Sequence, residues 1–142
     1  MTIRTLLGAS YKDVICAART DSVGHVVALL AERRIGCVPV VEDGKVLGIF
    51  SERDVLYGLA REGAQLLDRP VESVMTSPAV TIGLDTPIIA ALSLMTTRRI
   101  RHLPVMADGQ MVAFVSIGDL VKHRMDRIEA EADALRHYIQ SA

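Results

Sequence analysis

Apolar and polar residues follow a series of patterns along this chain that occurs twice. In the first half, a short apolar run at residues 14–17 predicts a strand, and an amphipathic stretch at residues 22–34 predicts a helix. Residues 37–41 form a continuous apolar run, as expected of a strand that is buried on both faces. Asp43-Gly44 predicts a tight hairpin turn, after which residues 46–50 form the returning strand.

The helix expected at residues 22–34 has a start signal and an apolar face. Asp21 is suited to be its N-cap, because a short side chain with a free oxygen can accept a hydrogen bond from an amide of the first turn. Val23, Val27 and Leu30 recur at the helical period and are expected to point inward. The returning strand is expected to lead into a second helix.

The second half of the chain follows the same plan. Strands are expected at residues 79–82, 103–106 and 111–115, with a hairpin turn at Asp108-Gly109. A helix is expected between the first two of these strands, ending near residue 99. Thr86 is its expected N-cap and Pro87 its expected first helical residue. The residues expected to point inward are Ile88, Leu92 and Met95.

The two halves are copies of one unit. A shift of 65 residues aligns residues 14–56 with residues 79–121 without a gap, and ten of the 43 pairs are identical. Residues 3–7 and 71–75 extend the repeat toward the N-terminus. Because a unit of about 60 residues buries too little surface to be stable alone, the copies are expected to share a core. We therefore expect an α+β (α/β) fold of two β-α-β-β-α repeats, packed sheet to sheet with pseudo-twofold symmetry and two equivalent pockets.

The repeat also indicates the domain boundaries and a helix beyond them. The first domain is expected at residues 1–62, a linker at 63–70, the second domain at 71–124 and a C-terminal helix at 118–140. Along that helix, apolar residues recur at spacings of four and three, as in the seam of a coiled coil. The seam consists of Val121, Met125, Ile128, Ala132, Leu135 and Ile139. It is expected to pack on the chain's own body or, as we favour, on a second copy in a homodimer.

Composition and charge narrow the class of protein. Sixteen basic residues balance seventeen acidic ones and only 4% of residues are aromatic, which argues against a nucleic-acid partner. No apolar run approaches the ~20 residues of a membrane span, and the N-terminus lacks a signal peptide's apolar stretch. The expectation is a cytoplasmic protein without a membrane partner. Cys16 and Cys37 match no zinc spacing, so no metal site is assigned. Both are expected to be small buried hydrophobes, with a redox or metal role as the alternative.

The element Ser-x-x-Asp occurs once in each copy, as Ser51 with Asp54 and as Ser116 with Asp119. Each serine stands where a strand turns into a helix, and each aspartate falls in the first turn, where the helix dipole favours a negative charge. A fixed carboxylate accepts two hydrogen bonds, which suits the two hydroxyls of a ribose. The alternative is a capping box that only stabilises the helix start.

With this element in place, the chain resembles a tandem pair of cystathionine β-synthase (CBS) domains, a Bateman module of the stand-alone bacterial type. The resemblance rests on residues 36–41 and 48–54 in the first copy, and on residues 101–105 and 115–120 in the second. Val74-Met75-Thr76 matches the usual entry to a second copy. The resemblance implies a regulatory sensor, not an enzyme, that binds AMP, ADP, ATP or NAD as ligand. An S-adenosylmethionine sensor and a ligand-free dimerisation scaffold are the alternatives.

The resemblance also implies two pockets, each shared between the copies. One pocket is expected to hold adenine on Ile15, Cys16, Ile35, Gly36, Cys37 and Pro39, with ribose on Ser116 and Asp119. The other is expected to use Val80, Thr81, Ile100, Arg101, His102 and Pro104, with ribose on Ser51 and Asp54. Phosphates are expected at Arg53, Arg101 and His102.

The two expected pockets differ in charge. Arg101-His102 stand where the first copy has Gly36-Cys37, and Arg53 stands where the second copy has Gly118. The pocket of Asp54 is therefore expected to gather more positive charge and to favour phosphorylated ligands. The Arg98-Arg99 pair, which ends a helix, either complements the helix dipole or contacts phosphate.

Overall fold

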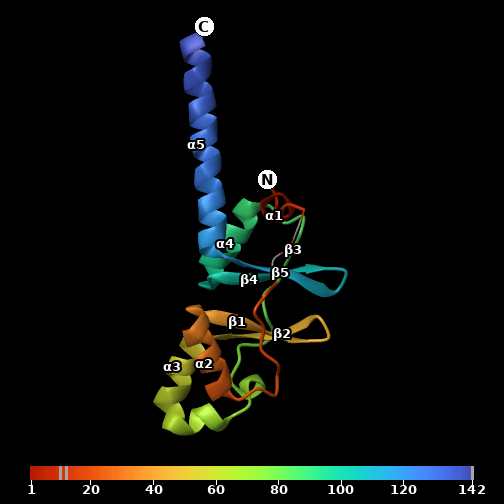
Figure 1. The fold of residues 1–142 in the computed structure, drawn as a ribbon, viewed down its shortest axis with the longest axis vertical. Coiled ribbons are helices and arrows are strands. Elements are labelled where there is room, and N and C mark those ends of the chain that lie inside the picture. Colours follow the sequence, from red (N-terminus) through yellow and green to blue (C-terminus); the bar gives the residue numbers. More distant parts are fainter. Residues whose placement is uncertain (10, 12, 142) are drawn as a thin grey trace.

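Two small sheets lie one above the other in the computed structural model, which describes residues 1–9, 11 and 13–141 (Figure 1). The first repeat contains α2 (Val23–Arg33), β1 (Cys37–Glu42), β2 (Lys45–Ser51) and α3 (Glu52–Glu62). The second repeat contains β3 (Ile82–Gly83), α4 (Ile88–Arg98), β4 (His102–Ala107), β5 (Gln110–Ser116) and α5 (Ile117–Ser141). Strands β1 and β2 are antiparallel, as are β4 and β5, while β3 runs parallel to β4. The expected α+β fold of two stacked repeats with a C-terminal helix is confirmed.

Both hairpins have the turn that their sequences predict. Asp43 and Gly44 have φ of 51° and 78°, and Asp108 and Gly109 have φ of 53° and 76°. Asp-Gly suits this turn because both of its central residues need a left-handed backbone. The hairpins lie side by side with their tips pointing the same way (Figure 1), and the Met111 N–H donates to the Gly44 carbonyl at 2.9 Å.

The start of α2 differs from the expectation by one residue. Ser22 is the N-cap, and its Oγ accepts a hydrogen bond from the His25 N–H at 3.1 Å. The carboxylate of Asp21 instead accepts a hydrogen bond from the Ala18 N–H at 2.9 Å. Asp21 was therefore wrong as the N-cap, because its side chain closes the turn that precedes the helix.

The start of α4 is displaced in the same way. Pro87 is the N-cap and Ile88 the first helical residue, so Thr86 was wrong as the N-cap and Pro87 as the first helical position. The Thr86 Oγ1 accepts a hydrogen bond from the Gly83 N–H at 3.1 Å. Thr86 and Asp21 occupy equivalent positions, 65 residues apart. Each accepts a hydrogen bond from the amide three residues earlier, and in each case the next residue is the N-cap.

The remaining differences concern the strands and helix faces at the start of each repeat. Residues 14–17 form no strand within the described part of the chain, only a parallel bridge from Ala17 to Val40. On the helices, Val26 and Ala91 are fully buried, whereas the expected inward residues at 27 and 92 are only partly buried.

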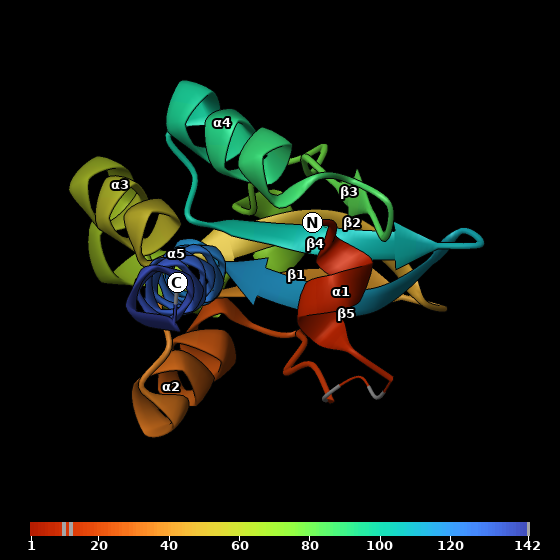
Figure 2. The ribbon, with the colours of Figure 1, turned by 90° about the horizontal axis from the view of Figure 1, so that it is seen from above.

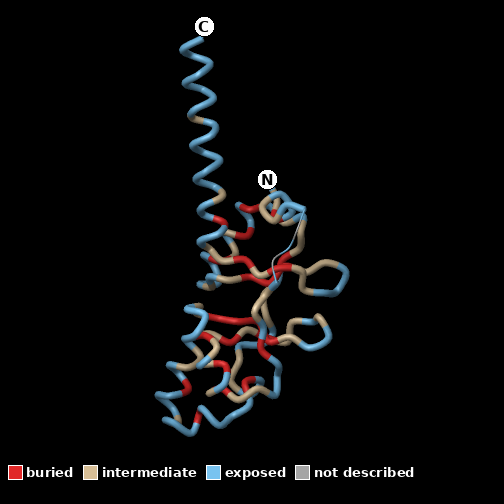
Figure 3. Tube along the Cα trace, in the orientation of Figure 1, coloured by how far each residue is buried: buried red, intermediate tan, exposed pale blue. Residues whose placement is uncertain are grey.

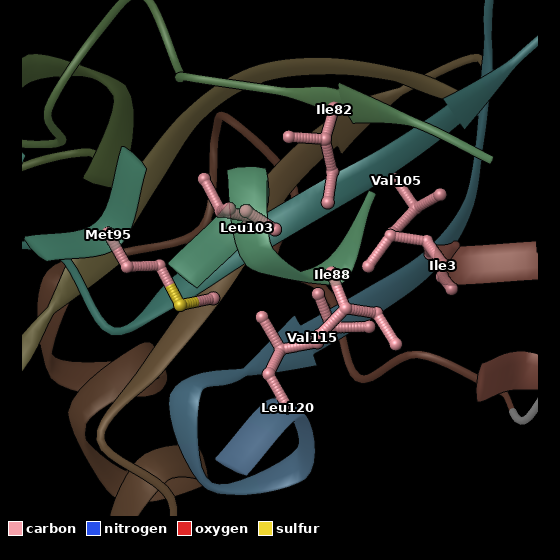
Figure 4. Close-up of a cluster of buried hydrophobic side chains, with 10 residues drawn as sticks. Ile3, Ile82, Ile88, Met95, Leu103, Val105, Val115 and Leu120 are labelled. Carbon is pink, nitrogen blue, oxygen red and sulfur yellow. The ribbon is translucent and has the colours of Figure 1, made fainter. Parts of the chain in front are cut away.

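Each repeat has its own hydrophobic core, so the expectation of one shared core was wrong. The segment that precedes each repeat belongs to the opposite core. Ile3, in α1 (Ile3–Leu7), is 0% exposed and packs in the second repeat beside Ile88 and Val105 (Figure 4). Val71, in the 3₁₀ turn η2 (Val71–Ser73), packs in the core of the first repeat. The two repeats therefore exchange their leading segments.

Backbone hydrogen bonds hold the exchanged segments in place. The Ile3 N–H donates to the Thr86 carbonyl at 3.0 Å, and the Val71 N–H donates to the Asp21 carbonyl at 2.7 Å. The segment expected as a linker is also packed: residues 63–68 form the 3₁₀ helix η1 (Gly63–Asp68), and Leu66 is 0% exposed in the first core.

Helix α5 extends far beyond the body of the molecule. Seen from above, its axis lies between α2 and α3 (Figure 2), and most of its length is exposed (Figure 3). Within the described part of the chain, none of the helices has the length and apolar character of a membrane span.

Candidate functional site

Ser51 and Asp54 form a complete capping box at the start of α3. The Asp54 Oδ2 accepts hydrogen bonds from the Ser51 N–H at 2.9 Å and the Ser51 hydroxyl at 3.2 Å. The Ser51 Oγ in turn accepts a bond from the Asp54 N–H at 3.4 Å. The other carboxylate oxygen, Oδ1, accepts a bond from the Thr76 hydroxyl at 3.0 Å. Thr76 is itself held on β2 by two backbone hydrogen bonds with Ile49, so Asp54 is fixed by its own helix start and by the segment that leads into the second repeat.

Ser116 and Asp119 form the same two capping-box hydrogen bonds at the start of α5. The Ser116 N–H donates to the Asp119 Oδ2 at 2.9 Å, and the Asp119 N–H donates to the Ser116 Oγ at 3.1 Å. The Asp119 Oδ1 accepts no hydrogen bond from the part of the chain that is described. The capping box, which is the alternative to a ribose-binding role, is thus present at both sites. In each site, the hydrogen bonds from the aspartate's own helix start involve only its Oδ2 atom.

Asp54 lies in a pocket between the repeats with a volume of about 610 Å³. Of the residues expected here, the lining contains Ser51, Arg53, Asp54, Val80, Ile100, Arg101 and His102. It does not contain Thr81 or Pro104. It also contains Gly36, Cys37, Ile49, Glu52, Leu56, Tyr57, Thr76, Pro78, Ala79, Arg98 and Arg99. We call this the Asp54 pocket.

A second pocket of about 540 Å³ contains Asp119. Of the residues expected here, the lining contains Ile15, Ile35, Cys37, Ser116 and Asp119. It does not contain Cys16, Gly36 or Pro39. It also contains Leu6, Leu7, Asp13, Val14, His102, Ala113, Phe114, Val115, Lys122, His123 and Asp126. We call this the Asp119 pocket.

The two pockets carry opposite charge. The Asp54 pocket has four arginines, at 53, 98, 99 and 101, against the carboxylates of Glu52 and Asp54. The Asp119 pocket has Lys122 against the carboxylates of Asp13, Asp119 and Asp126. The Asp54 pocket is therefore the more attractive of the two for an anion, in the direction that the sequence indicates.

Two side-chain hydrogen bonds join the first repeat to the second at the edge of the Asp54 pocket. Arg101 Nη2 donates to Glu52 Oε1 at 2.9 Å, and Arg53 Nη1 donates to the Arg99 carbonyl at 3.4 Å. Two of the arginines that could hold a phosphate are thus already placed by contacts within the protein.

His102 lies between the two pockets and lines both. Its ring stacks on Phe114, with centroids 5.3 Å apart and an interplanar angle of 19°. Burial, followed by the charge of Arg101, lowers the pKa of His102 from its ordinary value of 6.5. The imidazole is therefore neutral at pH 7, and it can donate or accept a hydrogen bond but carries no charge for a phosphate.

The two cysteines are unlike reactive thiols. Burial raises the pKa of Cys37 to about 12, and burial also raises the pKa of Cys16. Because the thiolate is the reactive form, both side chains remain thiols at neutral pH. Cys37 is a buried wall residue shared by the two pockets. Cys16 is exposed, so the expectation of a buried hydrophobe was wrong for Cys16.

A family model for the CBS domain matches this chain twice, over residues 9–61 and 71–126. The chain belongs to the CBS domain family. The two matched segments are the two repeats, and they cover most of the sequence.

Curated relatives and solved structures agree with this assignment. A CBS domain-containing protein of Arabidopsis thaliana, CBSX3, is 34% identical over 84% of this chain, which spans 61% of that relative. YhcV of Bacillus subtilis is 26% identical, over 83% of this chain and 84% of the relative. A crystal structure of a CBS-domain protein from Agrobacterium tumefaciens has a TM-score of 0.79 and 35% identity, covering 87% of this chain and 98% of that chain.

One solved CBS domain structure is a complex with AMP. It is the Pyrobaculum aerophilum protein, which has a TM-score of 0.72 and 26% identity and covers 84% of this chain and 89% of that chain.

Several lining residues were missed by the sequence analysis. Tyr57 lies one helical turn after Asp54 on α3, so helical spacing alone would have placed it on the same face. Asp126 follows Asp119 by seven residues on α5, so helical spacing also places it on the same face. Asp13 carries no comparable signal, because it comes from the segment before the first repeat, and only the folded chain brings it beside Asp119.

Proposed function

We propose that this CBS pair is a regulatory module that binds an adenosine nucleotide in the Asp54 pocket. The observation that carries the proposal is the position of Asp54: a carboxylate fixed by a capping box at the edge of a pocket between the repeats, beside four arginines. The complex of the Pyrobaculum aerophilum CBS protein with AMP supports the choice of ligand class.

Each part of the ligand has a matching part of the pocket. Val80 and Ile100 provide apolar walls for adenine, and Asp54 accepts the ribose hydroxyls. Oδ1 of Asp54 has lone pairs for a ribose hydroxyl in addition to Thr76. Arg53 and Arg101 bind phosphate through charge-assisted hydrogen bonds, with Arg98 and Arg99 adding positive charge. His102, being neutral, contributes a hydrogen bond at most.

The Asp119 pocket binds phosphorylated ligands more weakly. Asp13, Asp119 and Asp126 repel a phosphate, and Lys122 alone opposes them. The equivalent of Arg53 in this copy is Gly118, which has no side chain to reach a ligand. One phosphorylated nucleotide for each chain is therefore the expected stoichiometry.

The module acts as a homodimer joined along the seam of α5. Five seam residues, Val121, Met125, Ile128, Leu135 and Ile139, are exposed large hydrophobics in the single chain. A row of exposed apolar side chains along one helix is stabilised by burial against a partner. The proposal assigns no catalytic residue.

A ligand-free scaffold is the second candidate. The observation that favours it is the capping box, which accounts for Ser51 and Asp54 without any ligand. In that case the pockets would be a by-product of packing two repeats, and dimerisation through α5 would be the function.

Calorimetric titration separates the two candidates. The chain is titrated with AMP, ADP, ATP, NAD, adenosine and S-adenosylmethionine, and melting is followed with the same ligands. Saturable binding of a phosphorylated adenosine ligand, with a stoichiometry near one, supports the nucleotide module. Absence of binding by every compound at millimolar concentration supports the scaffold.

A further inference from the structure

An ion pair joins the two repeats at the edge of the Asp54 pocket. Arg101 Nη2 and Glu52 Oε1 are 2.9 Å apart, and each side chain is 65% exposed. Glu52 is the first residue of α3, whereas Arg101 directly precedes β4 of the other repeat. Since Arg101 is a proposed phosphate ligand, the carboxylate of Glu52 already holds the guanidinium that a phosphate would use.

The backbone leaves room for this pair on one side of the pseudo-twofold axis. The Glu52 N–H donates to the Gly36 carbonyl at 2.9 Å, and a Cβ added to Gly36 would lie 3.3 Å from Glu52 Oε1. The absence of a side chain at Gly36 thus allows the Glu52 carboxylate to lie over it and reach Arg101.

The other side of the axis has the same backbone contact without the charges. The Ile117 N–H donates to the Arg101 carbonyl at 2.8 Å, which is the equivalent bond 65 residues on. On that side Ile117 takes the position of Glu52, and Gly36 takes the position of Arg101, so neither charge of the pair is present. Among the described residues, this cross-repeat ion pair is therefore confined to the Asp54 pocket.

Building on the proposed function, we propose that Glu52 is a specificity-determining residue that competes with the ligand's phosphate for Arg101. A phosphate bound to Arg101 must displace the Glu52 carboxylate and then lies close to it, with like charges repelling. The competition weakens binding more as the ligand carries more negative charge. Adenosine, which lacks a phosphate, does not contest the pair and is unaffected.

The Glu52–Arg101 ion pair changes which ligands the four arginines of the Asp54 pocket favour. An arginine cluster alone would attract any small polyanion. With Glu52 on Arg101, phosphate alone gains little, and tight binding also requires the adenine walls and Asp54. Glu52 thus favours a ligand with few phosphates attached to adenosine over free polyphosphate.

The test compares Glu52→Gln with the wild-type chain by calorimetric titration of adenosine, AMP and ATP. Because an exposed pair is weak, we expect AMP to bind about three- to tenfold more tightly to the variant, ATP to gain more, and adenosine to change less than about twofold. The matched control is Glu42→Gln. It removes the same charge from an ion pair of the same length, Arg19 with Glu42 at 2.9 Å, outside both pockets.

A second variant ties the effect to Arg101. Arg101→Ala removes the guanidinium for which Glu52 and the phosphate compete. Adding Glu52→Gln to that background should therefore change AMP affinity by less than about twofold, as the control does. An equal gain in both backgrounds would show that Glu52 acts through general charge and would overturn the proposal. So would a Glu52→Gln variant whose ratio of AMP to adenosine affinity equals that of the wild type.

Failure of the proposed function has a separate signature. If the wild-type chain binds neither adenosine nor AMP, the nucleotide module is wrong, and pyrophosphate becomes the probe of Glu52. Tighter binding of pyrophosphate by Glu52→Gln than by Glu42→Gln would then support the competition for Arg101, and equal binding would overturn it.

Discussion

Thr76 donates a 3.0 Å hydrogen bond to Oδ1 of Asp54, so a residue at the entry of the second repeat holds the carboxylate that opens α3 of the first. The same carboxylate accepts the Ser51 N–H through Oδ2. Asp54 therefore has its position determined by its own helix start and by the segment that leads into the second repeat, before any ligand contact is considered. Such a carboxylate is preorganised, because its orientation does not have to be selected during binding.

Replacing Asp54 by Asn tests its proposed contact with ribose. Asn keeps the shape but removes the charge and turns one acceptor into a donor, so AMP binding should weaken by about 1.5–3 kcal/mol, measured by calorimetry. Asp119→Asn should leave the binding of the first AMP nearly unchanged, because the Asp119 pocket disfavours phosphate.

The control for this prediction is Ser22→Ala. It removes a helix N-cap of the same kind, at a residue that lines neither pocket. Loss of the cap should destabilise the fold by about 1 kcal/mol without changing AMP affinity. If Asp54→Asn behaves like this control, Asp54 has only a capping role.

His102 should make stability depend on pH. Burial lowers its folded pKa below the ordinary value of 6.5, so the neutral imidazole stabilises the fold above about pH 6.5. That contribution is lost as the pH falls through the lowered folded pKa, because the unfolded chain takes up the proton first. Urea unfolding at pH 8 and pH 5 should therefore show a larger decrease for the wild type than for His102→Phe, which keeps an aromatic ring beside Phe114. Identical decreases would contradict this role.

Ile3 should stabilise the second repeat although it precedes the first. Its side chain is 0% exposed in the second core, so Ile3→Ala should lower the free energy of unfolding by about 2–4 kcal/mol in urea titrations. Ile89, on the exposed face of α4, is the matched control, and Ile89→Ala should change stability by less than about 0.5 kcal/mol. Equal effects of the two substitutions would show that the exchanged segment does not pack in solution.

The seam of α5 should determine the oligomeric state. Sedimentation should give a mass near twice 15.4 kDa for the wild type. Ile128 and Leu135 are 50% and 60% exposed in the single chain, and their joint replacement by Asp should produce monomers, because charges would be buried in the interface. Ala130→Asp, outside the seam, should remain dimeric. A monomeric wild type at micromolar concentration would contradict the proposed dimer.

Local signals in the sequence were sufficient for the two hairpins, the helices that flank them and the Ser-x-x-Asp elements, but not for the strands expected at residues 14–17 and 79–82, since only β3 (Ile82–Gly83) forms there. The Asp-Gly pairs predicted both hairpins because their left-handed backbone depends on two adjacent residues only. Ser51 and Asp54 predicted the start of α3 for the same reason, since a capping box involves residues three apart. The one-residue errors at Asp21 and Thr86 arose because each side chain accepts a hydrogen bond from the amide three residues earlier, and the local pattern does not show that this turn precedes the helix.

The tertiary structure alone decided which distant residues meet. Nothing in the sequence near Ile3 indicates that it packs in the second core, because its burial depends on core residues of the second repeat, from Ile82 onward. The Glu52–Arg101 pair and the place of Asp13 in the Asp119 pocket are likewise contacts between segments far apart in the chain. The repeat made two pockets predictable, and the residues that differ between the copies predicted which pocket is more positive. The exchange of leading segments between the repeats follows only from how the two copies pack.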